Sequence, residues 1–171
     1  MGQVNASEAR YIAPFNGAVE IGLRALTVLT AAFPAFYSIQ RLVVFDYLLV
    51  HSDDVSDGPA GLHPKTPHRG AELLVRRGVL QEGIRLYQNR GLVEARYEDA
   101  GVYYSATENS AAFLDVLASA YLIALRDRAD WVIRRFGANT DGEIQRLANQ
   151  HAGEWGAEFA MESVLRQEEN E

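Results

Sequence analysis

The chain has 171 residues, of which 48% are hydrophobic and 23% are charged, and its formal net charge is -7 at pH 7. This length and composition are typical of one globular domain, with or without added helices. Because the sequence contains no cysteine, disulfide bonds, thiolate zinc sites, iron–sulfur clusters and cysteine nucleophiles are excluded.

Residues 1–17 carry Asn, Ser, Pro and Gly without periodicity and are predicted to form a lead-in loop. The first twelve residues lack a basic region followed by an apolar run, so no signal peptide is expected. No stretch of the sequence reaches the roughly 18 consecutive apolar residues of a membrane span. The expected location is the cytoplasm.

Two apolar helices are predicted next. In residues 18–33 apolar side chains recur at helical spacing until Pro34 ends the pattern; they are Val19, Leu23, Leu26, Leu29 and Phe33. Ser38 is a candidate N-cap for a second helix over residues 39–50, which is apolar on nearly every side and therefore expected at the centre of the fold. Its polar exceptions need hydrogen-bond partners, because unpaired buried charge is costly; they are Gln40, Arg41 and Asp46.

Residues 51–67 are rich in Pro and Gly, lack any period and are predicted to form an ordered surface loop. Three histidines and three aspartates cluster in or beside this loop: His51, His63, His68, Asp53, Asp54 and Asp57. They are candidate ligands for an oxygen-coordinated metal or, less plausibly, zinc, but their spacing matches no known ligand pattern. Loop aspartates more often bond their own backbone in turns, so a polar loop without a metal is the favoured interpretation.

The segment 70–106 has the pattern of a winged helix-turn-helix. A short helix is predicted to stop at Gly78, and a second helix, over residues 80–90, to end at Gly91, both within a helix-turn-helix unit over 70–91. Residues 92–97 and 102–106 are β-prone and flank a Gly-containing turn, so a hairpin wing is predicted over 92–106. The expected fold class is mainly α with a small β-hairpin wing and additional N- and C-terminal helices.

A long helix over residues 108–136, capped by Thr107 and ended by Gly137, is predicted after the wing. The segment 138–171 follows as an acidic tail that is weakly amphipathic to about residue 165. The predicted organisation is therefore a lead-in (1–17), a helical winged helix-turn-helix domain (18–137) and the tail (138–171).

Charge is distributed unevenly along the sequence. Residues 68–96 hold six arginines against three glutamates, a balance of +3, whereas residues 139–171 hold two arginines against eight acids, a balance of -6. Five arginines of the basic part are candidate DNA contacts: Arg76, Arg77, Arg85, Arg90 and Arg96. A solvated or protein-facing basic surface explains them equally well, and the overall charge argues against a dedicated duplex binder.

Motifs of catalysis are missing from the sequence. The glycines at 78 and 83 lack the Lys-Ser/Thr of a phosphate-binding loop, and no Gly-x-Ser-x-Gly elbow occurs. No enzyme activity and no cofactor are therefore expected. A metal-dependent enzyme built on the histidine loop is a weaker alternative.

Several short segments resemble the middle component of bacterial three-component ABC-ATPase systems. The resemblance spans roughly residues 18–125 and is carried by QRLVVFDYLLVHS (40–52), GP (58–59), LHP (62–64), GAELLVRR (70–77), GLV (91–93) and YSATE (104–108). In Lamassu-like loci, such a small winged-helix protein is encoded beside an SMC- or Rad50-like coiled-coil ABC ATPase and an effector, often a nuclease. The resemblance implies a non-catalytic adaptor between these two partners in defence against phages or plasmids.

An adaptor needs interface anchors, which are often aromatic. The candidates are Tyr103, Tyr104, Trp131, Trp155 and Phe159, although Trp131 and Tyr104 are equally suited to a hydrophobic core. The alternative function is that of a MarR-like winged-helix regulator of transcription, which would bind DNA and dimerise through the helix predicted over 108–136.

Overall fold

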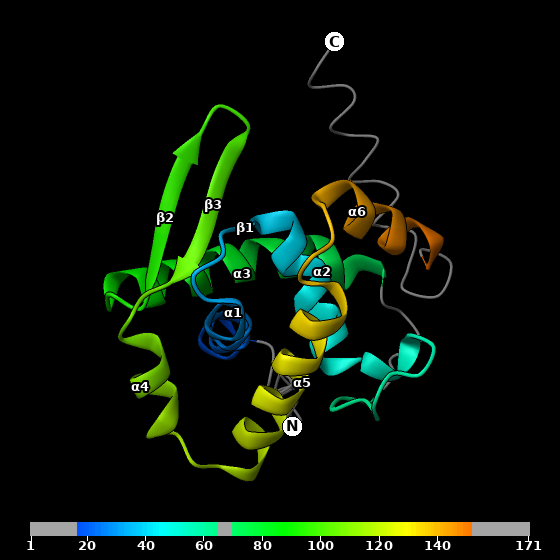
Figure 1. Ribbon diagram of the computed structural model, residues 1–171, viewed down its shortest axis with the longest axis horizontal. Coiled ribbons are helices and arrows are strands. Elements are labelled where there is room, and N and C mark those ends of the chain that lie inside the picture. Colours follow the sequence, from blue (N-terminus) through cyan, green and yellow to red (C-terminus); the bar gives the residue numbers. More distant parts are fainter. Residues whose placement is uncertain (1–16, 65–69, 152–171) are drawn as a thin grey trace, which may run out of the picture.

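The computed structural model describes residues 17–64 and 70–151. Within them the chain forms six α-helices, one short 3-10 helix and three strands. In chain order these are α1 (Ala18–Ala32), β1 (Tyr37–Ser38), α2 (Ile39–Val50), η1 (Ser52–Asp54), α3 (Gly70–Asn89), β2 (Val93–Glu98), β3 (Gly101–Ala106), α4 (Ser110–Asp115), α5 (Ala120–Phe136) and α6 (Asp141–Gln150). The strands form an antiparallel sheet in the order β1-β3-β2 (Figure 1).

Helix α2 lies at the centre of the fold, as its all-round apolar sequence predicts. Its side chains Leu42, Phe45, Leu48 and Leu49 are at most 1% exposed, and α1, α3, α5 and α6 all pack against it. The Ser38 side chain accepts a hydrogen bond from the Arg41 N–H, which confirms the predicted N-cap.

Helices α1 and α3 approach each other most closely at two glycines. A Cβ atom built on Gly22 would lie 2.8 Å from the backbone of Gly83, and one built on Gly83 would lie 2.4 Å from the Ala18 carbonyl oxygen. The lack of side chains at these two positions therefore sets the distance between the helices.

The predicted helix-turn-helix within 70–91 is wrong, because α3 is one continuous helix. Gly78 lies inside α3 with open space around it. A single exposed glycine destabilises a helix by only about 1 kcal/mol. This cost is too small to end a helix that packs against the rest of the fold on both sides of the glycine.

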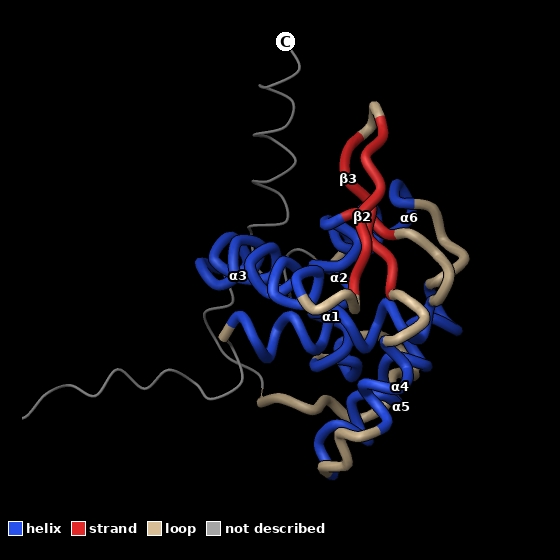
Figure 2. Tube along the Cα trace, turned by 90° about the vertical axis from the view of Figure 1, so that its left-hand side faces the viewer, coloured by secondary structure: helices blue, strands red, loops and turns tan. Residues whose placement is uncertain are grey.

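The predicted hairpin is confirmed. Gly91 has a φ of +69°, which ends α3 in the left-handed conformation, and Gly101 has a φ of +135° in the turn between β2 and β3. The sequence did not predict β1, whose residues Tyr37 and Ser38 pair with Tyr104 and Tyr103 of β3. The hairpin projects well beyond the helices (Figure 2).

The single long helix predicted over 108–136 is also wrong, because α4 and α5 are separate helices. Thr107 caps neither of them; its hydroxyl donates to the Gly91 carbonyl. The buried Ser110 hydroxyl donates to the Leu92 carbonyl and so fixes the start of α4 at the base of the hairpin. Ser119 then caps a new helix, whose apolar face packs on α1 and α2. That face is therefore not available for the dimer predicted for a regulator.

The predicted loop is folded onto the core as far as residue 64. The Leu62 and His63 N–H groups both donate to the Val50 carbonyl, and Ser52 is fully buried. Residues 65–67 lie outside the described part. Of the predicted tail, α6 is described and begins with a capping box between Thr140 and Glu143. No helix in the described ranges combines the length and apolar character needed to cross a membrane.

Candidate interaction site between α3 and the hairpin

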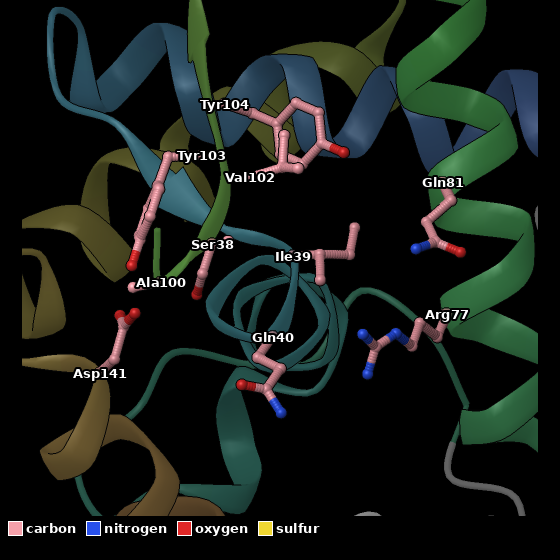
Figure 3. A pocket seen from close by; sticks show the side chains of 11 residues that line it. Ser38, Ile39, Gln40, Arg77, Gln81, Ala100, Val102, Tyr103, Tyr104 and Asp141 are labelled. Atoms are coloured by element: carbon pink, nitrogen blue, oxygen red, sulfur yellow. The ribbon is translucent and has the colours of Figure 1, made fainter. Parts of the chain in front are cut away.

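A hollow of about 390 Å³ lies between α3 and β3, where the first turn of α2 forms its floor (Figure 3). We name it the α3–hairpin groove. Residues from five helices and strands line it: Ser38 from β1, Ile39 and Gln40 from α2, Arg77 and Gln81 from α3, Gly101, Val102, Tyr103 and Tyr104 from β3, and Asp141 from α6, together with Ala100 of the turn.

The cationic side of the groove comes from one stripe of α3. Arg77, Gln81 and Arg85 are spaced four residues apart and therefore lie along the same side of the helix. Burial, and the neighbouring Tyr97, raise the pKa of Tyr104, while the charges of Arg85 and Arg77 lower it. Both arginines thus act on the strand opposite. In Figure 3 Tyr104 and Val102 point toward α3, whereas Tyr103 points toward Asp141.

The acidic residue of the groove is already neutralised. Asp141 Oδ1 accepts a hydrogen bond of 2.7 Å from Nε of Arg41, a residue that is only 8% exposed. The same guanidinium donates to the carbonyls of Asn139 and Gly137 and lies over the Tyr37 ring, 4.7 Å from its centroid. Asp141 therefore adds little uncompensated negative charge to the groove.

The five candidate DNA contacts do not form one surface. Arg77 lines the groove and Arg85 is exposed beside it, but Arg76 is buried at 8% exposure. Arg90 is exposed in the turn that follows α3. Arg96 lies on the hairpin, where it pairs with Glu98 at 2.5 Å and covers the Phe36 ring.

The candidate aromatic anchors are also dispersed. Tyr103 and Tyr104 line the groove and are half-buried. Trp131 is half-buried on α5, edge-on to Phe136 with ring centroids 5.8 Å apart. Trp155 and Phe159 lie outside the described residues.

A buried charge cluster lies in the core, where α1, α2 and α3 meet. The Arg24 guanidinium donates twice to Asp46, from Nε at 2.6 Å and from Nη2 at 2.9 Å, and both side chains are 1% exposed. Nη1 of Arg76 lies 3.7 Å from the same carboxylate and makes no hydrogen bond. The sequence predicted that Asp46 would need a partner but not that Arg24 would supply it.

The histidine loop does not form a metal site within the described residues, where no three His, Cys, Asp or Glu side chains are placed to hold an ion. His68 lies outside the described part. His63 stacks on Tyr121 and is hydrogen-bonded to its hydroxyl at 2.8 Å, and Arg128 donates twice to the Ala60 carbonyl. These contacts fasten the loop to α5.

Acidification is expected to weaken this attachment. Burial and the charges of Arg24 and His51 lower the pKa of His63 from 6.5 to about 4. At this side chain the unfolded chain therefore binds a proton more readily, so the stability that neutral His63 contributes falls as the pH drops from 6.5 toward 4, and this loss is complete below that value. Urea unfolding of the wild type and His63→Gln across this range measures the effect, and the variant should show a shallower decline. If the two proteins lose stability equally, the pH dependence does not come from the lowered pKa of His63 in the folded state.

Comparison with known proteins identifies the family. A family model described as ABC-three component (ABC-3C) system Middle Component 2 matches residues 14–158, which include every described helix and strand. Comparisons with curated proteins and with solved structures found no match. Since the matched segment covers most of the 171 residues, the chain belongs to the middle component 2 family of ABC-three component systems.

Proposed function

We propose that this protein is a non-catalytic adaptor that joins the ATPase of an ABC-three component system to its effector, in defence against phages or plasmids. The family match over residues 14–158 carries the proposal, because a middle component is defined by the system in which it takes part. The expected partners are an SMC- or Rad50-like coiled-coil ABC ATPase and an effector subunit, often a nuclease.

The fold supports a role in binding other macromolecules. The order α1, β1, α2, α3, β2, β3, with β1 paired to β3, supports a winged-helix arrangement in which α2 and α3 are the helix pair and β2–β3 the wing. We assign the protein to this arrangement, in place of the helix-turn-helix expected within α3. Winged helices serve as docking modules for both proteins and DNA.

Exposed apolar side chains are available for protein partners. Val116 and Ile123, at the corner between α4 and α5, are 76% and 55% exposed, and Tyr97 on the hairpin is 79% exposed. Buried aromatic and aliphatic anchors at the centre of an interface account for most of its binding energy. These three residues are therefore candidate partner contacts, in addition to Tyr103.

Copurification tests the adaptor role. The full chain, produced together with the ATPase and effector encoded beside it and with a tag on the ATPase, should elute with both in a single peak of defined mass by light scattering. Ile123→Asp should reduce its recovery at least about fivefold, because a buried carboxylate is costly at an apolar contact. Arg134→Asp, at an exposed position of the same helix, is the matched control. A chain that elutes alone contradicts the proposal.

A further inference from the structure

We infer that the α3–hairpin groove binds the phosphate backbone of duplex DNA. The inference goes beyond the adaptor role, which concerns protein partners, and either of the two can fail without the other. It depends on the geometry of the groove, the arrangement of its charges and the chemistry of the side chains along α3.

The spacing of the two arginines fits a duplex. Arg77 and Arg85 are eight residues apart, which is about 12 Å along the axis of α3. The major groove of B-DNA is about 12 Å wide and admits an α-helix. A helix in this groove runs along it, so two guanidiniums separated along the axis of α3 can contact different phosphates on the border of the groove.

The side chain between the arginines has the chemistry that base edges require. Gln81 is exposed midway between Arg77 and Arg85, and its amide both donates and accepts hydrogen bonds. Donor–acceptor side chains of this kind pair with adenine in the major groove.

Two further elements extend the contact surface. The first turn of α2 forms the floor of the groove at Ile39 and Gln40, and the backbone N–H groups of a helix N-terminus favour phosphate. The hairpin projects beside α3 (Figures 1 and 2) and carries Tyr97 with 79% of its surface exposed. The hairpin and α3 both contribute residues to the lining of the hollow.

Neighbouring acids limit the strength of binding. Glu82 follows Gln81 on α3, and Asp99 lies in the hairpin turn, both exposed. Together with the net charge of -7, they predict a dissociation constant in the micromolar range at about 50 mM salt, in the range of non-specific rather than specific binding. Inside an assembled complex, several such contacts would act together.

The test is fluorescence anisotropy of a labelled duplex of about 20 base pairs, titrated with the full chain at low salt. The double variant Arg77→Gln/Arg85→Gln should lose about tenfold or more in affinity, and the slope of log K against log salt should fall by about 2. The matched control is Arg90→Gln/Arg126→Gln, which removes the same charge. Arg90 follows the last residue of α3 and donates to the Leu86 carbonyl, and Arg126 pairs with Asp115 at the end of α4, away from the hairpin (Figure 1).

Three results would overturn the inference: a wild-type chain that does not bind the duplex, equal losses in the two double variants, or displacement of the duplex by poly-glutamate of the same total charge at the same concentration. The last result would identify the groove as a site for an acidic protein segment. Thermal unfolding of all variants checks that each is folded. The DNA-binding assay does not involve the ATPase. Its result therefore does not decide the adaptor role, which copurification tests.

Discussion

Asp46→Asn should destabilise the fold by about 3–5 kcal/mol, because it removes one partner of a buried ion pair and leaves the other charge uncompensated. Arg24 and Asp46 are each 1% exposed, so water cannot replace the lost carboxylate. The measurement is urea unfolding followed by tryptophan fluorescence. Asp115→Asn is the matched control, since the Asp115–Arg126 pair is 62% and 41% exposed and should contribute less than about 1 kcal/mol.

The Arg76→Met variant distinguishes the contribution of Arg76 from that of Arg24, the two arginines that face Asp46. Nη1 of Arg76 is 3.7 Å from the carboxylate and has no hydrogen bond, so its loss should cost far less than the loss of Asp46. Two results would show that the Arg24–Asp46 pair does not dominate the cluster. In the first, Arg76→Met destabilises the fold as much as Asp46→Asn does. In the second, Asp46→Asn destabilises it no more than Asp115→Asn does.

The same pair gives the fold an acid-sensitive component. Burial acts to raise the pKa of Asp46, but the charge and hydrogen bonds of Arg24, with a smaller contribution from Arg76, outweigh it and hold the pKa below its ordinary value. A carboxyl with a lowered folded pKa contributes stability that is complete above its unfolded pKa and is lost as the pH falls through the folded value. The loss should therefore occur below about pH 4 and be missing in Asp46→Asn.

Gly83→Ala should lower stability by at least about 2 kcal/mol, since an added methyl group would press on backbone atoms that cannot rotate away. Its Cβ would lie 2.4 Å from the Ala18 carbonyl oxygen and 2.7 Å from Cα of Gly22. In a chain of this length, the midpoint of thermal unfolding should fall by roughly 5–10 °C.

Gly78→Ala is the matched control for Gly83→Ala in the same helix. A Cβ at position 78 meets nothing within 4 Å, so this substitution should stabilise α3 by about 0.5–1 kcal/mol through helix propensity alone. Opposite signs for the two substitutions, measured by calorimetry, are the expected result. Equal effects would mean that the α1–α3 contact does not depend on the glycines.

The elements that the sequence predicted correctly are those with strong local patterns. The apolar run of α2 and its cap Ser38 are found as expected, and so are the hairpin and the left-handed Gly91. The break between α4 and α5 could not be predicted, because residues 115–120 are compatible with a helix. The position of α4 depends on Ser110, whose hydroxyl donates to the Leu92 carbonyl, 18 residues away.

The candidate site was also predicted only in part, because its residues are brought together by contacts between distant segments. Arg76 and Arg77 are neighbours in the sequence, but one helical step places Arg76 in the core and Arg77 in the groove. With a turn assumed at Gly78, the orientation of Arg77 relative to Arg85 could not be derived. Once α3 is continuous, their spacing places both on one side of it. The contribution of Asp141 depends on tertiary packing, which no local pattern encodes.

The position of Arg41 has a mechanical consequence. This side chain holds Asp141, a wall of the groove, and also the carbonyls of the turn that joins α5 to α6. A displacement of α6 would therefore move Asp141 and change the shape of the groove beside α3. The shape of the groove thus depends on Arg41, a side chain outside its lining.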